Sequence, residues 1–415
     1  MIPKNWSFVQ LGSVAKSQYG YTAKAIDDKS LPKMLRITDI QNGKVDWENV
    51  PNCQIDGELL KKYLLQDGDI VIARTGATTG KSYLLNNPIN SVFASYLIRL
   101  RSSKNLNVKY LYYFLQSNSY WNQISELAVG IAQPGVNSSK LQRINFPLPP
   151  LDEQQRIVDI IENLFAKLDK AKAFAQNIID NYELRRSSIL HRAFNGELTI
   201  IWRKNNNICF NSWKILKIGD FSFVTKLAGF EYTKYIFPSL SKIGIPLFKG
   251  KNVQDGNLML KFESYIPEKI SDNLYRSQLN RKCLLIPYVG TIGNIAIFDG
   301  TFKAHLGSNV GKIEINNLTF EEYLLYYLLS DFGYKELTKY KKATAQESIS
   351  IQAIRDVYVK LPTIEEQKEI VRILDSLLAK EQRTKELAEQ VLQKIDLMKK
   401  SILARAFRGE LNGSE

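Results

Sequence analysis

The sequence feature that most constrains the fold is a long internal repeat. Residues 148–158 read LPPLDEQQRIV, and residues 361–371, which lie 213 positions later, read LPTIEEQKEIV. The same offset aligns residues 188–198 with residues 401–411, and both segments contain Ser-Ile-Leu followed by Ala-Phe-x-Gly-Glu-Leu. This period is far longer than the roughly 20–45 residues of a solenoid repeat. The chain is therefore expected to consist of two copies of one unit.

The more similar end of each copy has the pattern of a long helix. Apolar residues recur at alternating steps of four and three, which is the heptad spacing of a coiled coil. Gly196 and Gly409 supply a stop at the end of each segment. We expect long helices within residues 151–197 and 362–415. The heptad positions are Ile157, Ile161, Leu164, Leu168, Ala171, Ala175, Ile178, Tyr182 and Ile189 in the first copy, and Ile370, Leu374, Leu377, Ala388, Val391, Ile395, Met398 and Ile402 in the second.

The first part of each copy, residues 1–150 and residues 198–361, is more variable and has a mixed α/β pattern. Residues 69–73 and 283–287 are short apolar runs before glycine-rich turns, which is typical of buried strands. Aromatic and apolar residues at helical spacing predict core helices near residues 110–115 and 322–329. The expected fold is thus two globular α/β (mixed α+β) domains, each followed by a long helix.

The positive charge lies on the two variable parts. Residues 1–150 contain 17 Lys and Arg against 10 Asp and Glu, and residues 198–361 contain 22 against 14. The helical segments are nearly neutral, although the whole chain has a net charge of +14. Such a surplus on two domains suggests that they bind a polyanion.

Composition and motifs argue against catalysis by this chain. Two histidines and three widely spaced cysteines offer no metal spacing and no catalytic triad. The segment Gly76–Ser82 resembles a phosphate-binding loop, but it has three residues between its glycines where that loop needs four. No apolar run suggests a membrane span or an export signal, so a cytoplasmic protein without metal or cofactor is expected.

Several loops carry Lys, Arg, Gln, Asn, Thr and Tyr, which hydrogen-bond to phosphates and base edges. Each such residue could equally serve only to form a turn. The candidate contacts in the first copy are Tyr19, Tyr21, Lys24, Arg36, Arg74, Thr78, Thr79, Lys81, Gln133 and Asn137. Those in the second copy are Lys226, Tyr232, Lys234, Lys249, Lys251, Tyr288, Thr291, His305, Asn309, Lys341, Lys342 and Gln346.

On the doubled motifs at 148–158 and 361–371, the Ser-Ile-Leu segments, and the Trp-x-x-x-x-[Leu/Ile]-Gly starts at Trp6 and Trp213, the chain resembles a specificity subunit of a type I restriction–modification system. The resemblance covers essentially the full length. It implies two target-recognition domains, at residues 1–150 and 198–361. It also implies that the long helices at 151–197 and 362–415 pack antiparallel as a spacer.

The resemblance further implies partners and chemistry. Each domain would read one half of a split sequence in double-stranded DNA, and two methyltransferase subunits and the restriction (motor–nuclease) subunits would assemble on this chain. S-adenosylmethionine, ATP and Mg would then belong to those partner subunits. The residues expected to dock the partners are Ile157, Ile161, Leu164, Leu168, Ile370, Leu374, Leu377, Val391 and Ile395.

Two other classes of protein remain open from the sequence. One is a coiled-coil scaffold with two polyanion-binding domains, which would show salt dependence without sequence preference. The other is a self-sufficient nuclease or methyltransferase, which would show activity as the isolated chain.

Overall fold

A computed structural model of the chain describes residues 3–41, 43–128, 135–209, 212–254, 256–339 and 347–411. The contacts between residues divide the chain into two compact units. The first unit contains residues 1–176 and 389–415, and the second contains residues 177–388. Each unit therefore combines residues from both copies of the repeat.

The first unit is built on an antiparallel four-stranded sheet in the order β2-β9-β6-β7. The strands of this unit are β1 Ser7–Gln10, β2 Ala15–Tyr19, β3 Lys33–Leu35, β4 Ile40–Gln41, β5 Lys44–Val45, β6 Ile70–Ala73, β7 Ser82–Leu84, β8 Ser91–Phe93, β9 Leu97–Ser102 and β10 Asn145–Leu148. The helices before the long segment are α1 Leu11–Val14, α2 Gly57–Tyr63, α3 Val108–Phe114, α4 Asn118–Ala128 and α5 Ser138–Gln142.

The second unit repeats this plan with the sheet β12-β21-β18-β19 and adds the sheet β16-β13-β20-β17. Its strands are β11 Lys214–Lys217, β12 Ser222–Lys226, β13 Ile245–Phe248, β14 Val253–Gln254, β15 Asn257–Leu258, β16 Tyr265–Ile266, β17 Gln278–Leu279, β18 Cys283–Pro287, β19 Ala296–Phe298, β20 Ala304–Leu306, β21 Val310–Ile315 and β22 Tyr358–Leu361. Its shorter helices are α8 Ile200–Asn205, α9 Ile218–Phe221, α10 Gly229–Glu231, α11 Glu268–Asn273, α12 Glu321–Leu329, α13 Asp331–Thr338 and α14 Ile351–Arg355.

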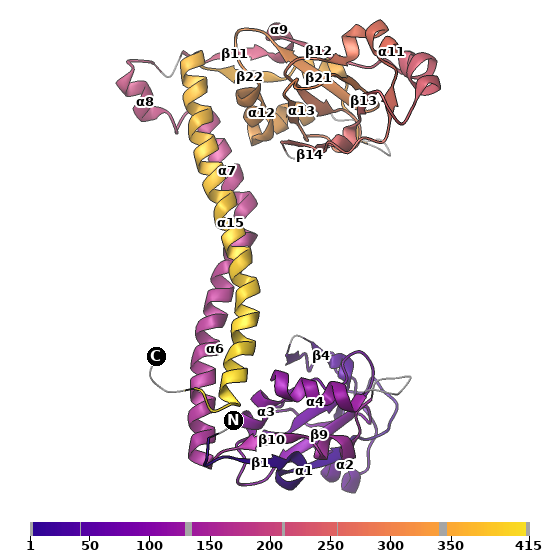
Figure 1. Ribbon diagram of the computed structural model, residues 1–415, viewed down its shortest axis with the longest axis vertical. Coiled ribbons are helices and arrows are strands. Elements are labelled where there is room, and N and C mark those ends of the chain that lie inside the picture. The colour runs from indigo at the N-terminus through magenta and orange to yellow at the C-terminus, as the bar shows by residue number, and fades with distance from the viewer. Residues whose placement is uncertain are drawn as a thin grey trace. The chain divides into compact units, whose positions relative to one another are not determined.

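The long segments are helical, as expected (Figure 1). The second is one helix, α15 Ile364–Ala406, whereas the first is divided at Asn181 into α6 Leu151–Asp180 and α7 Tyr182–Phe194. Both α6 and α15 extend across the boundary between the two units. The helical segments are therefore shared by the two units.

Within each unit the paired helices run antiparallel. In the first unit Lys399 pairs with Asp169 at 2.6 Å, and Arg156, earlier in α6, donates to the backbone oxygen of Leu411, later in the chain. In the second unit the Lys385 ammonium lies over the Tyr182 ring, and Arg185 pairs with Glu381 at 2.6 Å. The antiparallel arrangement that the resemblance implies is thus present in both units.

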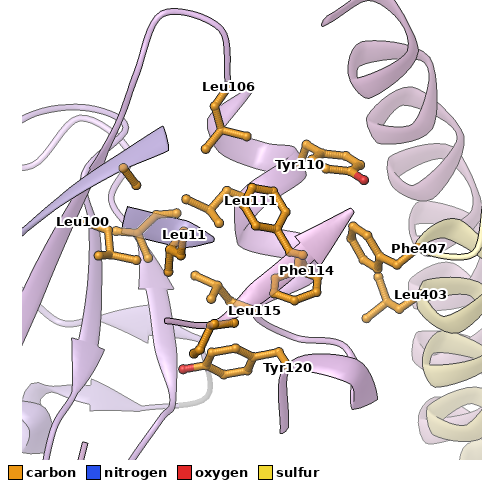
Figure 2. Close-up of a cluster of buried hydrophobic side chains, with 14 of the residues drawn as sticks. Leu11, Leu100, Leu106, Tyr110, Leu111, Phe114, Leu115, Tyr120, Leu403 and Phe407 are labelled. Carbon is orange, nitrogen blue, oxygen red and sulfur yellow. The ribbon is translucent and has the colours of Figure 1, made fainter. Parts of the chain in front are cut away.

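The end of each long segment packs on the globular domain of the other repeat. In the first unit the Phe407 ring, just after α15, lies 5.2 Å from Tyr110 and 5.4 Å from Phe114 (Figure 2). In the second unit Phe194 of α7 makes the same contacts, at 5.5 Å from Tyr323 and 5.1 Å from Tyr327. The repeated Ala-Phe motif is therefore an anchor, since it joins each helix end to a buried aromatic cluster.

The expected strands and core helices are confirmed in β6, β18, α3 and α12. The mixed helix and sheet fold with two globular domains and long antiparallel helices is also confirmed. In the part of the chain that the structure describes, no helix is long and apolar enough to span a membrane.

Candidate nucleic-acid interface

In each unit, segments distant in the sequence meet beside a glycine turn. In the first unit the turn follows β6 at Arg74, whose N–H donates to Tyr96 (3.0 Å) and whose carbonyl accepts from Val136 (2.9 Å). The end of β2 joins this group because the Tyr19 hydroxyl accepts from the N–H of Ser138 at 2.9 Å. The structure thus brings together parts of three loops that the sequence analysis singled out.

The second unit repeats this arrangement after β18. The N–H of Tyr288 donates to Asn309 (3.2 Å), and its carbonyl accepts from Ile349 (2.9 Å). The loop that contains Gly250 lies beside the segment that contains Asn309, since the N–H of Gly250 donates to the carbonyl of Ser308 at 3.2 Å. We call these two regions the glycine-turn surfaces. They are defined by Tyr19, Arg74, Gly76, Tyr96 and Asn137 in the first unit, and by Lys226, Tyr288, Gly290, Asn309 and Thr291 in the second.

The turns themselves are open. Gly76 and Gly290 have φ values of +82° and +87°, a region that favours glycine. A Cβ built on either glycine would meet no atom within 4 Å. A ligand backbone can therefore approach both turns closely.

Other predicted contacts in the first unit are held in place by their neighbours. Asp39 accepts two hydrogen bonds from Arg36, and these bonds raise the pKa of the guanidinium. Asn137 caps α5 by accepting from the N–H of Lys140. Thr79 closes its own turn through a hydrogen bond to Gly76 at 2.7 Å.

The remaining candidates of the first unit lie on or near the surface. Thr78 and Lys81 line a cavity of about 560 Å³, together with Tyr83, Trp121 and other residues. Lys24 is exposed, whereas Tyr21 packs against Tyr63 at 5.3 Å.

In the second unit, several predicted contacts have partners within the domain. Lys249 donates to Ser264 at 3.0 Å, and Lys251 pairs with Glu263, whose pKa it lowers through that hydrogen bond. Lys234 lies over the Tyr235 ring and Tyr232 packs on Phe237. Thr291 and Asn309 are exposed.

His305 requires a correction. It lies in β20, an inner strand of its sheet, and its side chain is completely buried. Burial lowers the pKa of the imidazole, although its Nδ1 lies 2.8 Å from the Leu306 carbonyl oxygen. The prediction that His305 contacts a base is therefore wrong, because the side chain cannot reach the surface.

The predicted partner-docking residues also need correction. Ile157, Ile161, Ile370, Leu374 and Ile395 are at most 2% exposed, so they are not available to another chain. They pack inside the two units instead. Leu377 is half-buried, and Leu164 and Leu168 line a groove of about 300 Å³ beside Met398. Val391 is the exposed member of the predicted set, at 40%.

Tyr96 belongs to the first glycine-turn surface and was missed. Its side chain is 63% exposed, and its carbonyl accepts from Arg74. The repeat offset contained the signal, since Tyr96 is the equivalent of Asn309. Four other predicted contacts, Gln133, Lys341, Lys342 and Gln346, lie outside the described residues.

No cluster of three or more His, Cys, Asp or Glu within the described ranges could hold a metal ion. Within the described residues, the two glycine-turn surfaces combine exposed polar and aromatic side chains on basic domains. Such surfaces are suited to binding a polyanion.

Comparison with known proteins identifies the family. The family described as "Type I restriction modification DNA specificity domain" matches residues 3–176 and 211–393. The specificity subunit of the type I restriction enzyme EcoKI from Escherichia coli K12 is 28% identical, over 99% of this chain and 90% of its own length. The MjaVIII specificity subunit of Methanocaldococcus jannaschii is 23% identical, over 95% of this chain and 92% of its own length.

The comparison with solved structures shows the same fold. The HsdS subunit from Thermoanaerobacter tengcongensis superposes with a TM-score of 0.69 at 19% identity, covering 99% of this chain and 98% of that one. The family match extends over both copies of the repeat. The chain therefore belongs to the type I restriction–modification specificity subunits, which recognise DNA and are not themselves catalytic.

Proposed function

We propose that this chain reads a bipartite, asymmetric DNA target and directs methyltransferase and restriction subunits to it. One half-site would be read by each recognition domain, with an unread spacer between them. The observation that supports this most is the pair of glycine-turn surfaces, because equivalent backbone positions carry different side chains. Arg74 in one domain corresponds to Tyr288 in the other, and Tyr96 corresponds to Asn309.

Charge and helix structure also support the proposal. The excess of Lys and Arg on both recognition domains favours binding to the phosphate backbone of DNA. Antiparallel helices are suited to holding two half-site readers at a fixed spacing. We propose that this chain itself needs no cofactor, and that S-adenosylmethionine, ATP and Mg act in the partner subunits.

The test is a map of modified adenines. The chain would be expressed with its companion methyltransferase subunit in an unmethylated host, and the methylated positions would be sequenced. A split, asymmetric motif that vanishes when this chain is omitted is the expected result. If the assembled complex methylates no specific motif, the proposal fails and the scaffold alternative gains support. Methylation or nuclease activity of the isolated chain would instead support the self-sufficient enzyme.

Docking of two identical partner subunits is supported by exposed apolar residues on the helices. Phe174 and Leu397 of the first unit are 72% and 64% exposed. Their repeat equivalents in the second unit, Leu387 and Leu184, are 46% and 69% exposed. Large exposed apolar side chains mark interaction surfaces when they gather. Their occurrence at the same positions of both copies is expected if each copy receives one partner of the same kind.

The docking proposal is tested by partner stoichiometry, measured by native mass spectrometry. Phe174→Gln with Leu397→Gln should leave one bound methyltransferase subunit, and so should Leu184→Gln with Leu387→Gln. All four substitutions together should leave none. Ile243→Gln, at a residue that is 81% exposed on the second recognition domain, is the control and should retain both. Two bound subunits in every variant would refute this surface.

A further inference from the structure

The two glycine-turn surfaces contain the same cation–π contact with the roles of its two positions exchanged. In the first unit the Arg74 guanidinium carbon lies 4.9 Å from the centroid of the Tyr19 ring. In the second unit the Lys226 ammonium lies 4.5 Å from the centroid of the Tyr288 ring. The cation comes from the turn in one domain and from the strand in the other.

The strand positions are equivalent by register. Tyr19 is the last residue of β2 and pairs with Ile98 of β9. Lys226 is the last residue of β12 and pairs with Gly311 of β21. Ile98 and Gly311 are related by the repeat offset. The aromatic residue of one domain thus stands where the other domain has its cation.

The turn positions are equivalent by register and by hydrogen bonding. Ala73 and Pro287, the residues just before them, pair with Leu97 and Val310, which are also related by the repeat offset. Arg74 and Tyr288 then each donate to one loop and accept from another, as described above. The exchange therefore concerns side chains on a common backbone.

The contact holds each cation in place without neutralising it. A ring face attracts a cation through its quadrupole and brings no opposite formal charge. Among the described residues, the Arg74 guanidinium donates one hydrogen bond, a long one of 3.4 Å to the Ser95 carbonyl. Most of its five N–H donors therefore remain available to a ligand. A side chain ordered in advance loses less entropy when it binds.

We propose that these exchanged pairs, Arg74 on Tyr19 and Lys226 on Tyr288, determine base preference in the two half-sites. The proposal rests on the DNA-reading function put forward above. Arg and Lys recognise the O6 and N7 acceptors of guanine in the major groove. The cation comes from the glycine turn in the first domain and from the end of a strand in the second. The two cations would therefore contact guanines at different positions within their half-sites.

The decisive experiment exchanges the roles in one domain. The variant Tyr19→Lys with Arg74→Tyr keeps the number of cations and rings and the net charge, and it gives the first domain the arrangement of the second. In the adenine methylation map, the first half-site should change at the guanine position, while the second half-site and the spacer stay as in the wild type. The reciprocal variant, Lys226→Tyr with Tyr288→Arg, is the matched control and should change the second half-site alone.

Folding is checked separately by thermal unfolding of the purified variants. Tyr19→Lys alone places a lysine beside Arg74. Because the two positive charges repel each other, the unfolding midpoint of this variant should be lower than that of the exchanged variant. If the exchanged variant does not fold, Arg74→Gln and Lys226→Gln replace it. Each should reduce discrimination at one base pair of one half-site by about 5- to 150-fold, the equivalent of 1–3 kcal/mol.

Two results would overturn the inference while leaving the proposed function intact. One is an unchanged pair of half-sites in folded exchange variants. The other is a uniform loss of affinity for all sequences in Arg74→Gln, which would assign the cation to a phosphate. A wild-type complex without any split motif would instead refute the proposed function itself.

Discussion

Arg203 and Glu366 form a buried ion pair whose loss should destabilise the second unit. The Arg203 Nη1 lies 2.6 Å from Glu366 Oε1, and the two side chains are 8% and 0% exposed. The same carboxylate accepts from the Thr199 hydroxyl at 2.7 Å and from the Trp213 indole N–H at 3.0 Å. Arg203→Met would remove the guanidinium and leave a carboxylate buried without its counter-charge.

The expected loss is about 3–5 kcal/mol, the range for breaking one partner of a buried pair. For a unit of about 200 residues, each 1 kcal/mol shifts the unfolding midpoint by about 2–4 °C. The midpoint of the second unit should therefore fall by about 6–20 °C. Replacing Glu366 by Gln in the same chain removes the unpaired charge and should restore a large part of this loss.

The repeat provides a matched control. Glu153 is the equivalent of Glu366, but its partner is Arg156, three residues later, and the two side chains are 27% and 42% exposed. Arg156→Met should cost about 1 kcal/mol or less. Both variants would be followed by urea and thermal unfolding with circular dichroism. An Arg203→Met loss no larger than that of Arg156→Met would refute the reasoning.

Three further predictions address other parts of the chain. Inserting one helical turn near Asn177, with a matching turn near Gln390, should lengthen the unread spacer by about two base pairs. One helical turn adds about 5.4 Å, and one base-pair step is about 3.4 Å. A changed half-site with an unchanged spacer would contradict this prediction. One thiol per native chain, Cys209, should react with a thiol reagent, since Cys53 and Cys283 are buried and burial raises the pKa of Cys283 to about 12; modification of three thiols at equal rates would contradict this. Burial alone would raise the pKa of Glu314, but hydrogen bonds from Arg281 and Lys312 outweigh it and lower that pKa. The stabilisation from Glu314 should therefore be complete above its ordinary value of 4.5 and be lost as pH falls through the lowered pKa, and Glu314→Gln should flatten the dependence of the unfolding midpoint on acid pH.

The repeat and its heptad pattern were sufficient to predict two α/β domains, each followed by a long helix, whereas the antiparallel packing of the helices was implied by the family resemblance. An exact offset aligns whole segments, and a helical period over about 40 residues leaves little ambiguity about the element. Sharing of the long helices between two units was not predictable in this way. A heptad pattern shows which face of a helix is buried, but it does not show which domain covers the ends.

The errors in the site have the same physical origin. Ile157, Ile370 and Ile395 are heptad positions of the helices to which the resemblance assigned docking, and an apolar heptad pattern selects residues for burial within the chain. His305 was selected as a candidate base contact within residues 304–309. Its strand is covered on both faces, and both of its neighbours in β20 are also buried. Local sequence gives no sign of a covering layer that comes from distant strands.

The two copies show which features of the unit are constrained. Gln154 and Gln367 are both buried, and both donate to the carbonyl of the proline five residues before them. These glutamines, with Phe194 and Phe407, fasten each recognition domain to a helix.

At the glycine-turn surfaces the backbone bonds persist while the side chains change. Arg74 and Tyr288 keep equivalent backbone hydrogen-bonding partners, and the cation–π contact persists with its partners exchanged. A mutation at Phe194 or Phe407 would disturb the buried packing of its unit, whereas a mutation at a glycine-turn surface chiefly changes the side chains presented to a ligand. Divergence between the two copies is therefore least constrained at the exposed side chains of the turns, which is what the proposed reading of two different half-sites requires.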